Sequence, residues 1–300
     1  MMILSTKNLM IAGGCSFTEN WVNKANTQMP ELWAKDKASN KYYKTKWKKI
    51  EPFEVWPDIV SRSQKLNLIN TAVAGSGNDA IFHKVIDQIF KYKKQIKLVV
   101  VMWSNWIRKD IQVNPNLWES TTFIQSHMHN RINLFKTMYE IGALNEFACI
   151  DYFFRYSMML EEICTSFDIK LVQCQGTSCL NSPHSLAEYQ VMNEIDNKDP
   201  AIRQQHLEVF WLNREKVTRK KYEIDFKRFI KYFIDHYGFD YLEAKDNFID
   251  WPLFPAIGGQ CFKDIIKSNW KKFQISELDA HPNGAAHQMY AGKILDKINA

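Results

Sequence analysis

Short apolar runs alternate along this 300-residue chain with segments whose apolar residues recur at helical spacing, and this alternation most constrains the fold. The clearest run is Leu98–Met102, and it follows a helical stripe over Asn78–Tyr92. Shorter runs predict strands at Leu9–Ala12, Leu68–Ile69 and Ile169–Cys174. Strands that are apolar throughout and separated by helices are typical of a parallel sheet. We therefore predict an α/β fold.

The remaining pattern predicts a single domain over residues 1–300 with two insertions. One insertion, at about 20–54, is a Lys- and Trp-rich excursion without clean periodicity, and the other, at about 180–270, is helical and rich in charge. The stretch from Trp103 to about His129 is expected to be irregular. Further helices are expected at Pro57–Leu66, Leu144–Phe167, Leu207–Glu223, Phe226–His236 and Gly284–Ile298.

Composition excludes several classes of protein. Hydrophobic residues make up 46% and charged residues 24%, which excludes disorder, collagen and coiled coil as the main state. No apolar run approaches the length of a membrane span, so we expect no membrane partner. The net charge of +6 is too small by itself to predict a nucleic-acid partner.

Two basic stretches, 35–49 and Arg214–Arg228, fit either a polyanion contact or an ordinary solvated face. Oligomeric state stays open.

The six cysteines form no Cys-x-x-Cys pair, and several stand in apolar runs such as Phe147–Ile150. We expect reduced, buried thiols, which suits a reducing compartment. The apolar stretch after Lys7 is too short for a secretory signal, so we expect the protein to be cytoplasmic as synthesised. Histidines and cysteines do not cluster at ligand spacing, and we expect no metal and no cofactor.

Three predicted strands end in small or polar residues, where ligands bind in sheets of this kind. The first strand ends in Gly13-Gly14-Cys15-Ser16-Phe17-Thr18, and the small residues allow a sharp turn that exposes Ser16. An exposed serine is a nucleophile when a base reaches it, although a structural turn is the alternative. The second strand leads into Asn70–Asp79, with Gly75 and Gly77 as either oxyanion or turn glycines. The third leads into Trp103–Arg108, where Asn105 is either an oxyanion donor or a helix cap.

Near the C-terminus stands a fourth block, Asp279-Ala280-His281-Pro282-Asn283-Gly284. The four blocks in this order resemble the SGNH or GDSL hydrolase superfamily, in particular its phage-type branch, whose first block reads Gly-Cys-Ser-Phe-Thr. The resemblance runs from residue 8 to about residue 298, without a match at 20–54 or 180–270. It implies a three-layer α/β/α architecture with a mainly parallel, flavodoxin-like sheet.

The resemblance also implies roles for individual residues. The nucleophile falls on Ser16, the base on His281 and its orienting acid on Asp279. The backbone N–H groups of Ser16 and Gly75 and the side-chain amide of Asn105 would then form the oxyanion hole.

Two of the blocks depart from the family pattern. The third reads Trp103-Ser104-Asn105-Trp106 where the family has Gly-x-Asn-Asp. In the fourth, Asp279 stands two residues before His281 where the family has three, so Glu277 or a backbone carbonyl are alternative orienters, and a Ser–His dyad is another. Apart from the family, His281-Pro282 also fits a helix start.

The function these residues predict is a serine esterase or deacylase acting on a small-molecule or polysaccharide ester. The resemblance implies removal of an acyl group, often acetyl, and the 14% aromatic content favours a carbohydrate, since sugar faces stack on Trp and Tyr. Arg108, Trp103 and Asn78 are candidates for contacting substrate, and His287 is expected to be a packing residue. The phage-type branch implies a virus-borne enzyme, with a virion location as one option. The alternative is a non-catalytic protein of the same fold that binds glycan or builds a virion.

Overall fold

The structure is a computed structural model, and it describes residues 7–19, 51–106, 108–114, 117–121, 146–177, 179, 245–253, 259–275 and 281–300. Most of both predicted insertions, including the helices expected at Leu207–Glu223 and Phe226–His236, lies outside these described residues. In chain order the elements are β1 (Leu9–Gly13), α4 (Trp56–Ser63), β2 (Asn67–Asn70), α5 (Asn78–Tyr92), β3 (Ile96–Trp103), β4 (Lys109–Asn114), β5 (Leu117–Thr121), α7 (Glu146–Ser166), β6 (Lys170–Gln175), α10 (Phe262–Ser268), α11 (Trp270–Phe273) and α12 (Gly284–Asn299).

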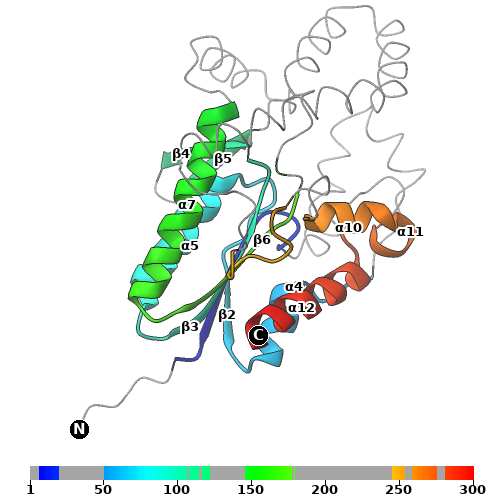
Figure 1. The fold of residues 1–300 in the computed structure, drawn as a ribbon, viewed down its shortest axis with the longest axis horizontal. Helices are drawn as coiled ribbons and strands as arrows, with labels where there is room; N and C mark the ends of the chain where they lie inside the picture. The colour runs from blue at the N-terminus through cyan, green and yellow to red at the C-terminus, as the bar shows by residue number, and fades with distance from the viewer. Residues whose placement is uncertain are drawn as a thin grey trace, which may run out of the picture.

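Four parallel strands form the central sheet in the order β2-β1-β3-β6, which confirms the α/β fold. Helices α5 and α7 lie along one face of this sheet, and α4 and α12 lie along the other (Figure 1). The chain runs from β1 through α4 to β2 at one side, then returns through α5 to β3 on the other side of β1. The carboxyl ends of β1 and β3 therefore flank the point where the strand order reverses, where open α/β sheets bind ligands.

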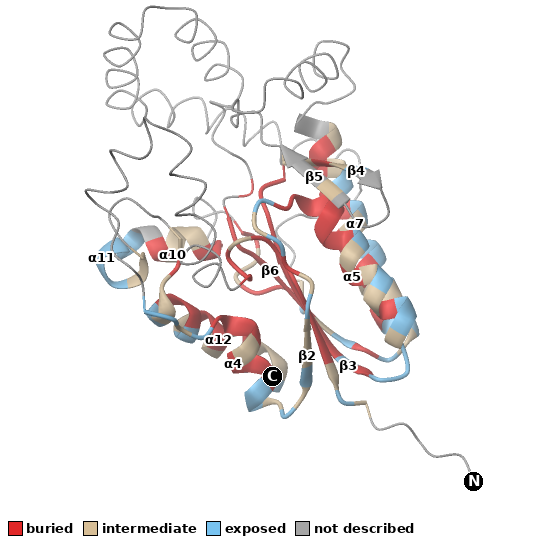
Figure 2. Cartoon of the chain, turned by 180° about the vertical axis from the view of Figure 1, so that it is seen from behind, coloured by how far each residue is buried: buried red, intermediate tan, exposed pale blue. Residues whose placement is uncertain are grey.

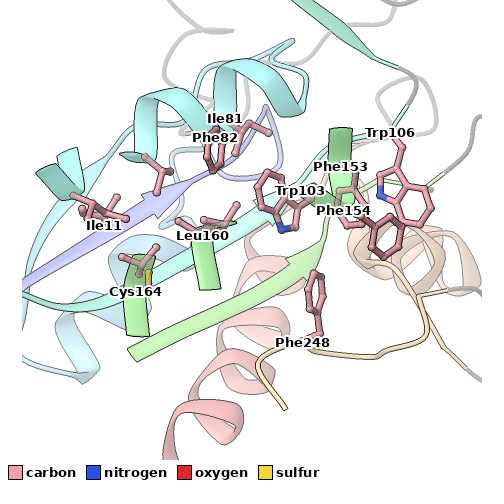
Figure 3. Packing of buried hydrophobic residues seen from close by; sticks show 14 of the residues in the cluster. Ile11, Ile81, Phe82, Trp103, Trp106, Phe153, Phe154, Leu160, Cys164 and Phe248 are labelled. Carbon is pink, nitrogen blue, oxygen red and sulfur yellow. The ribbon is translucent and has the colours of Figure 1, made fainter. Parts of the chain in front are cut away.

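Burial on both faces explains why the strands are apolar throughout. Seven of the eight residues of β3 are buried, because helices cover the sheet from both sides (Figure 2). The apolar side chains form two clusters. One lies between the sheet and α5 and α7 and contains the rings of Trp103, Trp106, Phe153 and Phe154 (Figure 3). The other joins the sheet to α4, α10 and α12, with Tyr290 stacked on Phe262.

Helix positions follow the local sequence signals closely. Helix α5 covers Asn78–Tyr92 as predicted, and α4 begins with Pro57 in its first turn, where a missing N–H leaves no bond unmade. Helix α12 buries Tyr290 and Ile294. All six cysteines are free and buried, which confirms the prediction of buried thiols. No helix within the described ranges is long and apolar enough to cross a membrane.

One expectation was wrong. The stretch after Trp103 was expected to be irregular, but β4 and β5 form an antiparallel hairpin there. Its sequence alternates polar and apolar residues over Asp110–Asn114, and Pro115-Asn116 stands between the two strands in the sequence. Alternation with a turn signal is the pattern of a two-stranded hairpin. The hairpin carries Asp110 back onto the start of α5.

Candidate active site

The turn after β1 presents Ser16. The N–H groups of Thr18 and Glu19 both donate to the carbonyl of Cys15, at 2.9 and 3.0 Å, which closes the chain into a tight turn. The Cys15 side chain is fully buried in the core, and Ser16 beside it is half-buried. The turn thus leaves the Ser16 hydroxyl accessible at the carboxyl end of β1.

His281 reaches this hydroxyl from the other end of the chain. Its Nε2 lies 3.1 Å from Ser16 Oγ, although the two residues are 265 positions apart in sequence. With the proton on Nδ1, Nε2 accepts the Ser16 O–H and can remove its proton. The Phe17 ring lies 5.8 Å from the imidazole, between centroids, and packs against it. A nucleophile and a base in contact are the minimum that serine catalysis requires.

The segment that carries His281 is held by main-chain and asparagine bonds. Ile275 N–H donates to the His281 carbonyl at 3.0 Å. The Asn283 side chain caps α12 by accepting from Ala286 N–H at 3.1 Å. Its Nδ2 also donates to the carbonyls of Lys272 and Gln274, at 2.8 and 3.0 Å. His281 is therefore held by the start of α12 and by residues 272–275. Asp279 and Glu277, the predicted orienters, lie outside the described residues.

The loop after β2 is bonded to the nucleophile turn at three points. Val73 N–H donates to the Gly14 carbonyl at 3.3 Å, Asn70 Nδ2 donates to the Thr18 carbonyl at 3.2 Å, and Ala74 N–H donates to Glu19 Oε2 at 2.6 Å. These bonds fix the loop against the turn that carries Ser16.

Gly75 differs from its neighbours in this loop. Of the amides from Thr71 to Gly77, that of Gly75 alone has no acceptor among the described residues. Gly75 has φ of +87°, a conformation that glycine adopts without cost, and no atom of the described residues lies within 4 Å of where a Cβ would stand. The Ser16 N–H likewise finds no acceptor among the described residues. Both amides are available to a developing oxyanion, the role that the sequence resemblance implies.

Asn105 follows β3 and is 3% exposed. The residue before it is held on both sides: Ser104 N–H donates to Asn78 Oδ1 at 2.8 Å, while Asn78 Nδ2 and Gln175 Nε2 donate to the Ser104 carbonyl at 3.3 and 2.8 Å. Arg108 N–H donates to the Asn105 carbonyl at 3.2 Å. The backbone of Asn105 is therefore fixed at the carboxyl end of β3, beside the strand that leads to Ser16.

The three side chains predicted to contact substrate form hydrogen bonds within the protein. Trp103 is fully buried in the core (Figure 3). Its indole N–H donates to Gln173 Oε1 at 2.8 Å. Asn78 is 4% exposed, and both polar atoms of its side-chain amide are hydrogen-bonded to the backbone of Ser104. These two expectations are corrected: both side chains serve the scaffold. Arg108 is half-buried, and its Nη1 donates to the Ser76 carbonyl at 3.0 Å, so it braces the loop that contains Gly75.

His287 is a packing residue, as expected. It is 2% exposed, its ring lies against Phe53 and Phe262, and its Nδ1 accepts from Trp56 N–H at 3.3 Å. Burial, with a smaller contribution from the nearby His281, lowers the pKa of His287 to about 3. This imidazole is therefore neutral at neutral pH and adds no charge beside the base.

Sequence reasoning missed two residues of the site, Glu19 and Asp110. Both are buried carboxylates that accept backbone N–H groups of the loop around Gly75. For Glu19 a signal existed, since a carboxylate directly after a buried strand and a tight turn must find donors. Asp110 stood in the stretch expected to be irregular and gave no such signal.

No protein-family model, curated protein or solved structure matches this chain. Within the described ranges, no three His, Cys, Asp or Glu side chains converge as a metal site would require.

Proposed function

We propose that the protein is a serine esterase or deacylase of the SGNH type, with Ser16 as nucleophile and His281 as base. The observation that carries this proposal is the 3.1 Å contact between Ser16 Oγ and His281 Nε2 at the point where the strand order reverses. Two unbonded amides, those of Ser16 and Gly75, support it. The strand order β2-β1-β3-β6, with helices on both faces, is compatible with the three-layer, flavodoxin-like architecture that the resemblance implies.

The reaction follows from these groups. His281 Nε2 takes the Ser16 proton while Oγ bonds to the acyl carbon, and the carbonyl oxygen becomes an oxyanion that the Ser16 and Gly75 N–H groups stabilise. Collapse of the tetrahedral species breaks the ester C–O bond, and the imidazolium returns its proton to the leaving alcohol. Water, deprotonated by His281, then attacks the acyl-serine and releases the acid. Asp279 is proposed to orient the imidazole.

For the substrate we propose an acyl ester, acetyl in the first instance, of a carbohydrate or related alcohol. Ser16 and His281 are both half-buried rather than enclosed, which suits a group carried on a larger molecule. The competing proposal, a non-catalytic protein of this fold that binds glycan or builds a virion, predicts no turnover at Ser16.

The experiment is hydrolysis of p-nitrophenyl acetate by the wild type and by Ser16→Ala and His281→Ala. Each variant is expected to lower kcat/KM by about 10³ or more, because neither residue of the pair works without the other. Ser268→Ala and His83→Ala, exposed residues on α10 and α5, are the matched controls and are expected to keep wild-type rates. A fluorophosphonate should label Ser16 in the wild type only. If the wild type and Ser16→Ala hydrolyse the ester at the same rate, and the fluorophosphonate does not label Ser16, the hydrolase proposal is overturned. The non-catalytic protein of this fold is then favoured.

A further inference from the structure

Two buried carboxylates take the amides on either side of Gly75. Glu19 is 9% exposed, and its Oε2 accepts from Ala74 N–H at 2.6 Å. Asp110 is 4% exposed, and its Oδ1 and Oδ2 accept from the N–H groups of Gly77 and Ala80, both at 2.8 Å. Hydrogen bonds to an ionised acceptor are about twice as strong as neutral ones. The strongest hydrogen bonds of residues 71–77 are thus those of Ala74 and Gly77, on either side of the Gly75 N–H.

Packing around the loop shows the same division. A Cβ on Gly77 would lie 2.7 Å from the Arg108 carbonyl oxygen and 2.8 Å from Asp110 Oδ2, so that end of the loop has no free space. A Cβ on Gly75 would meet no atom of the described residues within 4 Å. Among the described residues, the ends of the loop are packed against protein while its middle is not, the arrangement that a preorganised donor needs.

The two carboxylates come from different parts of the chain. Glu19 belongs to the turn that carries Ser16, so its bond to Ala74 sets the position of Gly75 relative to the nucleophile. Asp110 belongs to β4, five residues after Asn105, so its bonds connect the loop to the segment that follows β3. Both carboxylates contact this loop by accepting its backbone N–H groups.

We propose that Glu19 and Asp110 are positioning residues that hold the Gly75 N–H as an oxyanion donor. This inference rests on the proposed hydrolase function and deepens it. Because the oxyanion exists only along the reaction path, loss of its donor lowers kcat and leaves substrate binding unchanged. A residue that merely stabilised the fold would not produce that split.

The test compares Glu19→Ala and Glu19→Gln in the p-nitrophenyl acetate assay. Glu19→Ala is expected to lower kcat by about 10², with KM within twofold of wild type, as on removal of one oxyanion donor. Glu19→Gln keeps an acceptor oxygen at the same place and is expected to recover about tenfold of that loss, because only the charge is removed. The pH profile of kcat should not move, since His281 is intact. Affinity for an arylboronic acid, which forms a tetrahedral adduct with the serine, should fall in parallel with kcat.

Asp110→Ala and Asp110→Asn repeat the comparison from the other side of Gly75. The matched control is Asp264→Ala, since Asp264, in the first turn of α10, also accepts a backbone amide at a helix start, that of Cys261 at 3.1 Å. It is expected to lower the melting temperature without changing kcat. Rates are measured well below each melting temperature, and the Gln and Asn variants carry the test where an Ala variant does not fold.

The outcomes distinguish failure of the positioning role from failure of the proposed hydrolase function. If wild type is no faster than Ser16→Ala, the hydrolase proposal fails and the positioning role fails with it. If Ser16→Ala is inactive but Glu19→Ala and Asp110→Ala keep kcat and boronate affinity within twofold of wild type, the hydrolase stands and the positioning role is overturned. A rise in KM at constant kcat also overturns it, because that pattern belongs to a substrate contact.

Discussion

Ser16 and His281, the proposed nucleophile and base, are held by different means. On the nucleophile side, the turn over residues 14–19 is closely packed: a Cβ on Gly14 would lie 2.0 Å from Thr18 Oγ1, and the supporting carboxylates of Glu19 and Asp110 are buried. On the base side, residues 272–275 and 281–283, every residue except Pro282 is half-buried or exposed, and hydrogen bonds from Asn283 hold the segment. The nucleophile side should therefore be sensitive to added volume, and the base side to lost polar atoms.

The largest effect is expected for Gly14→Ala. The new methyl would also stand 2.6 Å from Thr18 Cβ, an atom that no side-chain rotation moves, and Thr18 is fully buried. We expect a loss of about 3 kcal/mol in the free energy of unfolding, measured by urea denaturation. Because Ser16 lies inside the turn that must open, kcat/KM should also fall by about 10².

Two variants show whether volume is the cause. Gly292→Ala on α12 adds the same methyl where nothing lies within 4 Å, and it is expected to gain about 0.5 to 1 kcal/mol from higher helix propensity. Thr18→Gly removes the obstructing atoms, so Gly14→Ala should cost much less in that background. Equal costs in both backgrounds would show that the turn is not limited by this contact.

The second effect concerns the base side. Asn283→Ala removes the α12 cap and both bonds to the carbonyls of Lys272 and Gln274. We expect a loss of about 2 kcal/mol in unfolding free energy. His281 stands two residues before this cap, so kcat/KM should fall about tenfold as Nε2 leaves its place beside Ser16.

Asn283→Asp separates the contribution of the α12 cap from that of the two bonds to the carbonyls of Lys272 and Gln274. The carboxylate still accepts from Ala286 N–H, but it cannot donate to the two carbonyls. We expect it to regain part of the lost stability while its kcat/KM stays as low as that of Asn283→Ala. Full activity in the Asp variant would mean that the cap alone positions His281, and the contrast between the two sides would then be one of helix capping.

Sequence alone predicted what depends on local periodicity. Helix α5 followed from apolar residues at helical spacing, because it buries one face, and the strand after it followed from a continuous apolar run, because helices cover both of its faces. The contact of Ser16 with His281 was expected only through a family resemblance, since nothing local relates residues so far apart. Trp103 was misplaced because a strand end does not reveal whether a ring faces the core. Asp110 was not predicted as a site residue, because it acts through a hydrogen bond to Gly77, 33 residues away in the sequence. The hairpin that contains Asp110 was not predicted either.

The smallest expected effect is one of pH, and it falls on the base side. His287 is buried with its Nδ1 accepting from Trp56 N–H, and its pKa of about 3 is well below the ordinary 6.5. Between these values the unfolded chain binds a proton that the folded chain does not, so stability falls as pH drops below 6.5, by about 1.4 kcal/mol per pH unit. Above pH 6.5 this loss is absent. Urea denaturation at pH 7 and pH 5 measures it.

His287→Gln isolates this contribution from that of other titrating groups. The variant is expected to be less stable at pH 7, since it loses packing against Phe53 and Phe262, yet its stability should change less between pH 7 and pH 5 than that of wild type. His83→Gln, on an exposed residue of α5, should keep the wild-type pH dependence. Because His287 lies in the first turn of α12, directly after the segment that carries His281, acid should weaken the attachment of the base before it weakens the packed turn around Ser16. A His287→Gln variant with the same pH dependence as wild type would place the acid sensitivity elsewhere and remove this distinction between the two sides.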